Sequence, residues 1–298
     1  MERYQYPFES HFITIDGVRI HYVDEGQGDP VLMVHGQPTW SYLWRNIIPV
    51  VARSHRAISL DLMGFGLSDK PQDRQYSFDE HTRILREFIE ALELKNLTLV
   101  LHDWGGPIGL EYAVYHQENM KKLVLLNTLA TVEFKLPWVF KAAFRSPFLS
   151  DFLIRRLNVF GLLAFRFGVR HSLSKQVLQN YRDPHPNYAS RKGVAQFPRL
   201  IPARPWDATY GPIKAISQAL ASFPIPTLFL FSDGDPVTAR IDARPVIEGM
   251  PNARLAVVKD AGHYLQEDQP EEVARNILEF LDQTEPSPTP TPHVSTDE

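Results

Sequence analysis

The chain has 298 residues, a net charge of −4 and no cysteine. The lack of cysteine excludes disulfides, thiolate catalysis and cysteine-ligated metals. Hydrophobic residues make up 44% and charged residues 22%, which predicts a large folded core rather than global disorder. This charge gives no electrostatic reason to expect nucleic acid or an anionic membrane as a partner.

Targeting and membrane segments are not expected either. The opening sequence MERYQYPFES is too polar for a signal peptide. The longest apolar stretch, residues 149–169, is interrupted by Asp151, Arg155, Arg156 and Arg166, so it fails as a transmembrane helix. We therefore expect a cytoplasmic protein that contacts neither membrane nor nucleic acid.

Short apolar runs recur along the chain and predict the strands of a sheet. The first two flank Asp16-Gly17, a strong hairpin signal. The later runs are continuously apolar, which is typical of strands buried on both faces of a parallel sheet. The predicted strands cover residues 12–15, 18–23, 31–34, 57–60, 97–101, 123–126, 227–231 and 255–258.

Helical patterns separate several of these runs, notably at residues 81–92, 107–115 and 273–281. Alternation of strand and helix after an opening hairpin predicts an α/β fold with a doubly wound, mostly parallel sheet. The alternation stops at residues 130–212, which we interpret as an inserted helical cap; extra helices on one sheet face are the alternative. The main domain would then comprise residues 1–129 and 213–284.

The last residues, 285–298, contain four prolines among small polar residues. Such a segment cannot bury a core, so we expect a disordered tail.

Asp103 is the first candidate for chemistry. The apolar run 97–101 leads into His102-Asp103-Trp104-Gly105-Gly106 and then into a predicted helix, which is the arrangement of a nucleophile elbow. A carboxylate there could displace a leaving group from saturated carbon and form an ester. The plainer alternative is that Asp103 only caps the helix.

His263 and a carboxylate follow in the chain order that this arrangement requires. Asp260-Ala261-Gly262-His263 comes after the last predicted strand, where a histidine would activate water. Asp235, in the loop after the run 227–231, would orient that histidine. Asp233 in the same loop is the alternative, although it suits a turn.

The loop that begins His35-Gly36-Gln37-Pro38 follows the run 31–34. At this place in the fold, the backbone N–H groups of Gln37 and Trp104 would bind the oxyanion of a tetrahedral intermediate. His35 is expected to hydrogen-bond the loop backbone.

Together, the segments HGQPTWSYLWR, HDWGG, DGDP and DAGH resemble the haloalkane dehalogenases of the α/β-hydrolase superfamily. The resemblance extends over residues 22–281 and is loose in the cap. It implies a mostly eight-stranded sheet with a helical lid over an apolar pocket. Asp103 would attack the halogen-bearing carbon, and the indole N–H of Trp104 would bind the halide. His263, held by Asp235, would then activate water.

The implied substrate is a small apolar halogenated molecule, and the products are an alcohol, a halide ion and a proton. The resemblance implies no metal and no organic cofactor. One position departs from the family, since Gln37 stands where asparagine or glutamate is usual. Gln37 could reach a halide or contribute only its backbone N–H. Trp138 in the cap is another candidate halide donor, with core packing as the alternative.

Other functions fit parts of the same pattern. An epoxide hydrolase would share the elbow and would use cap tyrosines as acids, for which Tyr181, Tyr188 and Tyr210 are available. Leu101 counts against it, because those hydrolases usually have glycine there.

A ligand-binding relative without activity is the third candidate. The presence of Asp103, Asp235 and His263 in the required order argues against it.

Overall fold

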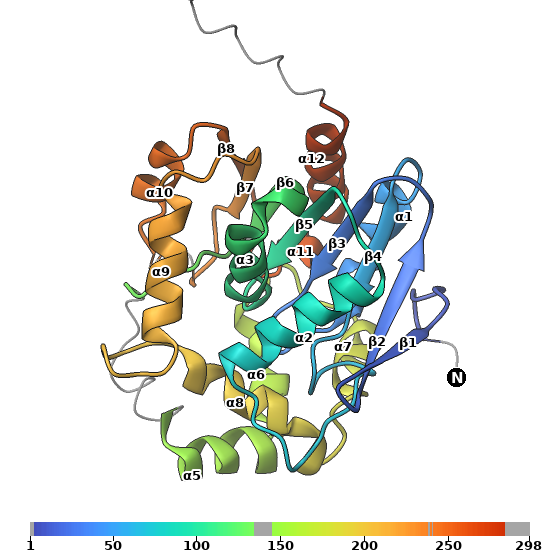
Figure 1. Cartoon of the computed structure of the whole chain (residues 1–298). Coiled ribbons are helices and arrows are strands. Elements are labelled where there is room, and N and C mark those ends of the chain that lie inside the picture. Colours follow the sequence, from blue (N-terminus) through green and yellow to red (C-terminus); the bar gives the residue numbers. More distant parts are fainter. Residues whose placement is uncertain (1–2, 134–144, 238, 240, 284–298) are drawn as a thin grey trace, which may run out of the picture.

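The computed structural model describes residues 3–133, 145–237, 239 and 241–283. These residues contain one eight-stranded sheet in the order β1-β2-β4-β3-β5-β6-β7-β8 (Figure 1). β1, β2 and β4 pair antiparallel, and the remaining pairs are parallel. The strands are β1 His11–Ile15, β2 Val18–Glu25, β3 Pro30–Val34, β4 Arg56–Leu60, β5 Leu97–His102, β6 Met120–Leu126, β7 Thr227–Ser232 and β8 Ala253–Val258.

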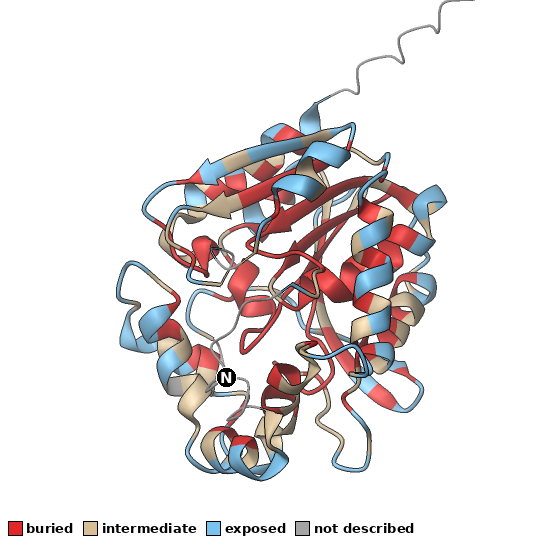
Figure 2. Cartoon of the chain, turned by 90° about the vertical axis from the view of Figure 1, so that its left-hand side faces the viewer, coloured by how far each residue is buried: buried red, intermediate tan, exposed pale blue. Residues whose placement is uncertain are grey.

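Each strand coincides with an apolar run of the sequence, so the predicted fold class is confirmed. The central strands β3 and β5 are almost wholly buried (Figure 2), which explains why their sequences do not alternate. Val34 pairs with both Leu60 and Leu101, so β3, β4 and β5 end at the same edge of the sheet. Side chains that follow these strands therefore meet at that edge.

Two layers of helices cover the sheet (Figure 1). α1 and α12 pack together on one face, and α2, α3 and α9 form a row on the other, with α10 beside α9. The helices are α1 Ile48–Val51, α2 Phe78–Ala91, α3 Gly105–Tyr115, α9 Tyr210–Leu220, α10 Arg244–Gly249, α11 Leu265–Asp268 and α12 Pro270–Asp282. Short 3₁₀ helices occur at η1 Ser41–Trp44 and η2 Gln117–Asn119.

A separate group of helices lies between β6 and β7 in the chain, beyond the edge where the parallel strands end (Figure 1). Its members are α5 Pro147–Ser150, the π-helix η3 Asp151–Arg156, α6 Val159–Phe167, α7 Lys175–Arg182, η4 Ala189–Arg191 and α8 Lys192–Leu200. We call this group the cap. The predicted boundary at residue 212 falls inside α9, which packs against α3 of the main domain.

Two predicted features lie outside the described residues: Trp138 and the tail 285–298. Among the residues that are described, no helix has the length and apolar character needed to cross a membrane.

The contact between β3 and α3 leaves no space for a side chain. A Cβ on Gly105 would lie 2.2 Å from the carbonyl oxygen of Val34, which is a backbone atom at the end of a central strand. Gly211 in α9 is different, because a Cβ there would meet no atom within 4 Å.

Gly105→Ala is therefore expected to lower the free energy of unfolding by about 1–3 kcal/mol or more, since the core must deform around one methyl group. Gly211→Ala should leave it unchanged or raise it by up to about 1 kcal/mol, because alanine favours the helix. Thermal and urea unfolding followed by circular dichroism would measure both. Equal stability of the two variants would contradict the tight contact.

Candidate active site

Asp103 occupies the sharp turn between β5 and α3. Its φ of +50° lies in the left-handed region, which non-glycine residues seldom adopt. Two hydrogen bonds to its carbonyl oxygen hold this conformation, one from the Gly106 N–H at 2.9 Å and one from the Thr128 hydroxyl at 2.6 Å. A strained backbone fixed by its neighbours is common at functional sites. The turn lifts the carboxylate above the end of the sheet.

The two carboxylate oxygens of Asp103 have different partners. Oδ1 accepts the backbone N–H of Gln37 at 2.6 Å, whereas Oδ2 lies 3.4 Å from Nε2 of His263. Burial acts to raise the pKa of Asp103, but the hydrogen bond and charge of His263, with help from Gln37, lower it overall. Asp103 is therefore an ionised carboxylate with one firmly held oxygen and one loosely held oxygen.

His263 follows β8 and lies between two carboxylates. Its Nδ1 is 3.1 Å from Oδ2 of Asp235, on the side opposite Asp103. Its backbone carbonyl accepts hydrogen bonds from His102 Nε2 at 2.9 Å and from Asn127 Nδ2 at 3.0 Å. The ring is thus fixed at both its backbone and its side chain.

Asp235, rather than Asp233, is the carboxylate beside the histidine. Asp235 is buried after β7, and its Oδ1 accepts the backbone N–H of Val237 at 2.7 Å. Asp233 instead lies near the backbone N–H of Ala261, 3.5 Å from it. The structure therefore brings together Asp103, Asp235 and His263, as the sequence predicted, although their catalytic roles stay predictions.

Charge, not solvation, controls the protonation of His263. Burial acts to lower its pKa, but Asp235 and Asp103 together raise it from 6.5 to about 10. At neutral pH the resting site accordingly holds an imidazolium between two carboxylates. Loss of either carboxylate charge would lower this pKa and release the proton.

A cavity of about 500 Å³ lies over Asp103 and His263, between the main domain and the cap. We call it the main cavity. Most of its walls are apolar. The apolar lining from the cap and the adjoining segments includes Val159, Phe160, Leu163, Ala164, Phe167, Pro198, Ile201, Pro202 and Ile213.

Few hydrogen-bond donors face the main cavity with hydrogens to spare. Asn127, Thr128, Arg145 and Tyr264 line it, but each already donates to a protein oxygen. Thr131 also lines it, and its hydroxyl oxygen accepts the Glu133 N–H. The indole N–H of Trp104 has no acceptor among the described residues. The Trp104 ring lines the cavity and packs edge-on against Phe197 at 5.5 Å. Trp104 is therefore positioned to bind an anion that leaves from a carbon near Asp103.

Gln37 uses its side chain for a different contact. Its Nε2 donates to the backbone carbonyl of Val194 in α8 at 2.7 Å. Its backbone carbonyl also accepts the hydroxyl of Tyr264 at 3.2 Å. The side-chain amide thus joins the loop after β3 to the cap, and the backbone N–H is the part of Gln37 that contacts Asp103.

Two buried polar side chains support this loop from behind. His35 bonds the Gly36 carbonyl through Nδ1 and accepts the Leu62 N–H through Nε2, so it is a neutral structural residue. Asp61 accepts the backbone N–H of Ser41 at 2.7 Å. These bonds fix the direction of the Gln37 N–H.

The cap tyrosines considered for an epoxide hydrolase lie away from the main cavity. The hydroxyl of Tyr181 donates to Glu267, and that of Tyr188 points toward Asp151 on the outside of the cap. Tyr210 begins α9 and does not line the cavity. None of the three could protonate a substrate oxygen held near Asp103.

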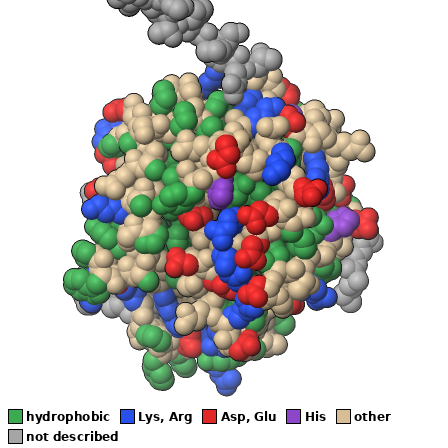
Figure 3. Space-filling model, in the orientation of Figure 1, with side chains coloured by type: hydrophobic (Ala, Val, Ile, Leu, Met, Phe, Trp, Pro, Cys, Tyr) green, Lys and Arg blue, Asp and Glu red, His purple; other side chains and the backbone are tan. Residues whose placement is uncertain are grey.

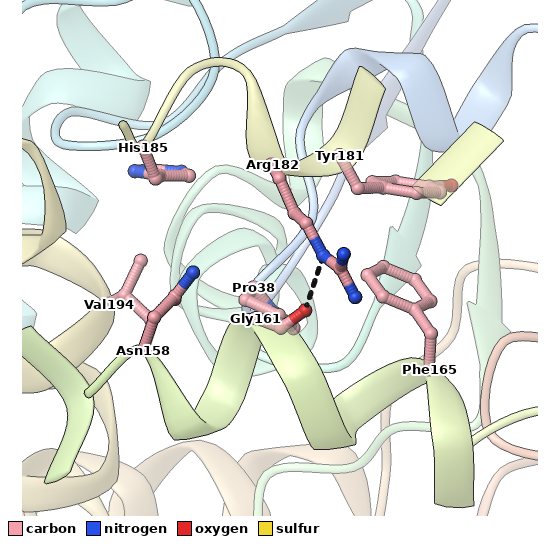
Figure 4. A pocket seen from close by; sticks show the side chains of 8 residues that line it. All are labelled: Pro38, Asn158, Gly161, Phe165, Tyr181, Arg182, His185 and Val194. Carbon is pink, nitrogen blue, oxygen red and sulfur yellow. Dashed lines mark hydrogen bonds between the residues drawn. The ribbon is translucent and has the colours of Figure 1, made fainter. Parts of the chain in front are cut away.

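Tyr181 instead borders a much smaller cavity, about 10 Å³, between the cap helices and Pro38 (Figure 4). Arg182 projects into it and bonds the Gly161 carbonyl through Nε at 3.2 Å. A space of this size holds at most about one water molecule, so it is not a substrate site.

Residues 29–270 match the family described as the alpha/beta hydrolase fold. The chain belongs to this family. It is 38% identical over 293 residues to the cis-3-alkyl-4-alkyloxetan-2-one decarboxylase of Shewanella oneidensis, covering 94% of this chain and 90% of that protein. It is 35% identical over 288 residues to a haloalkane dehalogenase of Psychrobacter cryohalolentis, covering 93% of each. The structure of haloalkane dehalogenase DatA from Agrobacterium tumefaciens C58 superimposes with a TM-score of 0.84 at 27% identity, covering 92% of this chain and 96% of that one.

These similarities confirm the predicted relationship to haloalkane dehalogenases within the fold family. The relative with 38% identity carries a different activity in its name, which the motifs alone did not suggest. Sequence reasoning also missed the supporting residues His102, Asn127 and Thr128. Their positions in the chain could have indicated them. His102 directly precedes the turn at Asp103, and Asn127 and Thr128 follow the end of β6 at the same edge of the sheet.

Asp103→Asn is expected to lower the pKa of His263 from about 10, because one of the two carboxylate charges that raise it is removed. In the parent, the folded pKa lies above 6.5, so this proton stabilises the fold fully below pH 6.5 and the contribution is lost as the pH rises through about 10. In the variant this contribution should be smaller, and its loss should be complete at a lower pH than in the parent.

Histidine NMR across a pH titration would measure this pKa directly. Asp233→Asn is the matched control, since it removes a carboxylate from the same loop as Asp235 without touching the ring. A His263 pKa that is the same in Asp103→Asn as in the parent would contradict the charge balance.

Proposed function

We propose that this chain is a haloalkane dehalogenase that cleaves carbon–halogen bonds of apolar substrates through a covalent ester on Asp103. The observation that carries the proposal is the pairing of an ionised, desolvated carboxylate with an unengaged indole N–H, both at the floor of an apolar cavity. A carboxylate in such surroundings is a stronger nucleophile than one in water.

In the first step, Oδ2 of Asp103 attacks the carbon from the side opposite the halogen. Oδ2 suits this role because its distance of 3.4 Å from His263 leaves it loosely held, while Oδ1 stays with the Gln37 N–H. The carbon–oxygen bond forms as the carbon–halogen bond breaks, and the halide departs with the bonding electrons. Trp104 donates its N–H to that halide.

In the second step, water hydrolyses the ester. Alkylation removes the charge of Asp103, so the pKa of His263 falls and the ring releases its proton. The neutral Nε2 then takes a proton from water, and the hydroxide adds to the ester carbon. Negative charge develops on Oδ1, which the Gln37 N–H already contacts. Collapse releases the alcohol and restores Asp103, and the scheme uses only side chains and water.

Decarboxylation of an oxetan-2-one is a second candidate, favoured by two observations. The side-chain amide of Gln37 is bonded to Val194, so halide binding rests mainly on Trp104. A relative at 38% identity is named for this reaction. Asp103 would attack the ring carbon that is bonded to the ring oxygen, so that this carbon–oxygen bond breaks and the ring carbonyl group is freed as a carboxylate. Loss of CO₂ would then form the carbon–carbon double bond and expel Asp103, with no water consumed.

Product analysis distinguishes the two candidates. With 1-bromobutane, we expect bromide, protons and butanol that carries ¹⁸O from labelled water, and we expect no turnover by Asp103→Ala. With a cis-3,4-dialkyl oxetan-2-one, the dehalogenase proposal predicts no alkene. Alkene and CO₂ from the lactone, without bromide release from 1-bromobutane, would overturn the dehalogenase assignment in favour of the second candidate.

His263→Ala is expected to accumulate the alkyl ester, because attack needs no base but hydrolysis does. Intact-protein mass spectrometry after incubation with 1-bromobutane should reveal a gain of one butyl group, located on Asp103 by peptide mapping. The double variant Asp103→Ala with His263→Ala is the control and should gain no mass. An unmodified His263→Ala protein would refute the two-step scheme.

A further inference from the structure

The net charge of −4 hides an uneven distribution. Residues 130–212 contain 13 of the 31 Lys and Arg residues but only 4 of the 35 Asp and Glu residues. This region therefore carries a net charge of +9, and the rest of the chain carries −13. The cap is a strongly basic unit on an acidic main domain, and the two nearly cancel in the total.

The same region exposes large apolar side chains. Phe148 is 87% exposed, Trp206 is 76% exposed and Phe167 is 69% exposed. Phe148, Leu149 and Phe152 lie on the continuous stretch of α5 and η3, while Leu163 and Phe167 are four residues apart on α6. We call Phe148, Leu149, Phe152, Leu163, Phe167 and Trp206 the cap apolar face.

The segments that carry this face adjoin one another. α6 packs against η3. Arg145, two residues before α5, bonds the Ile201 carbonyl and Asp207, which brings the loop holding Trp206 beside α5. Figure 3 shows hydrophobic and basic side chains together at the lower end of the molecule, where α5 lies in Figure 1. Apolar side chains exposed in this number mark an interaction surface.

Arginines without carboxylate partners lie on the same segments as the cap apolar face. Arg156, Arg166 and Arg204 are exposed, and none of them pairs with an acidic side chain among the described residues. The Arg166 guanidinium lies 5.9 Å from the centroid of the Phe167 ring, and that of Arg204 lies 5.6 Å from the centroid of the Trp206 ring. Both distances are typical of cation–π contacts. Their charges remain available to an anionic partner.

The face is continuous with the main cavity. Leu163 and Phe167 are exposed at the surface and also line the cavity that contains Asp103. An apolar molecule held against Leu163 and Phe167 at the surface therefore lies next to the apolar lining of the cavity. This connects the surface to the supply of an apolar substrate.

We infer that the cap docks onto the surface of an anionic lipid bilayer, with the cap apolar face inserted among the lipids and the arginines of the same segments against the headgroups. Exposed Phe, Leu and Trp side chains combined with Arg are the composition of peripheral membrane-binding surfaces. Each basic residue near an anionic bilayer adds to the attraction, which salt screens. The charge of −4 is an average over the basic cap region and the acidic main domain, so it does not describe the surface that the cap presents.

Flotation of the full chain with vesicles tests the inference without any substrate, so its outcome is independent of the catalytic proposal. We expect binding to vesicles of mixed phosphatidylglycerol and phosphatidylcholine, little binding to phosphatidylcholine alone, and a loss of binding at high salt. The triple variant Phe148→Ser, Phe152→Ser and Trp206→Ser should lower the bound-to-free ratio about tenfold or more. None of these three residues lines the main cavity.

Phe12→Ser with Tyr115→Ser is the matched control, because these exposed aromatic residues lie on β1 and α3, away from the cap. It should bind like the parent. A second variant, Arg156→Gln with Arg166→Gln and Arg204→Gln, should lose the preference for phosphatidylglycerol. Thermal unfolding checks that each variant is folded.

Absence of parent binding to the phosphatidylglycerol vesicles would overturn the inference, and so would equal binding by the parent and the triple aromatic variant. Sedimentation velocity without lipid tests the other possible occupant, a second copy of this chain. A dimer that the triple aromatic variant abolishes, together with no vesicle binding, would assign the face to self-association instead.

Discussion

The left-handed backbone of Asp103 is the constraint on which the site depends. At φ +50°, the turn brings the start of α3 so close to the end of β3 that Gly105 has no space for a side chain. Gly36 is similarly confined, since a Cβ there would lie 2.2 Å from Oδ1 of Asp103. The same closeness directs the Gln37 N–H onto that oxygen. The close packing of the loop after β3 against the turn after β5 thus determines that Oδ1 accepts a short hydrogen bond, while Oδ2 has only the longer contact with His263.

The electrostatics follow from this geometry. Two carboxylates and one imidazolium give the resting site a net charge of −1 in a poorly solvated place, where Coulomb interactions are strong. In the proposed mechanism, forming an ester on Asp103 removes one negative charge and leaves the histidine and Asp235 as a neutral pair overall. The proton of His263 then becomes easier to release, so the first chemical step prepares the base needed by the second.

Sequence patterns predicted the sheet and the meeting of Asp103, Asp235 and His263 because both depend on local signals, namely apolar runs and the residues that end them. The start of β6 was predicted three residues late, at Leu123, because Lys122 is charged. In the fold, its ammonium group is buried and bonds the carbonyls of Phe280 and Leu281 at the end of α12. The direction of the Gln37 side-chain amide could not be predicted either, because it depends on the carbonyl of Val194, which is 157 residues away in the sequence.

The uneven charge of the molecule has a bearing on the chemistry as well as on docking. The proposed cleavage would convert one apolar molecule into a halide and an alcohol inside an apolar cavity, and an unpaired ion in such surroundings is costly. Trp104 would offer a halide a single neutral hydrogen-bond donor, so the halide would be bound more weakly than in a site with two donors. On α6, Arg166 directly precedes Phe167, which lines the cavity, and the cationic side chain of Arg166 is exposed. A departing anion therefore moves from a poorly solvated position toward positive potential, which favours its release. The basic cap that we propose to bind an anionic surface would thus also assist the exit of the proposed anionic product.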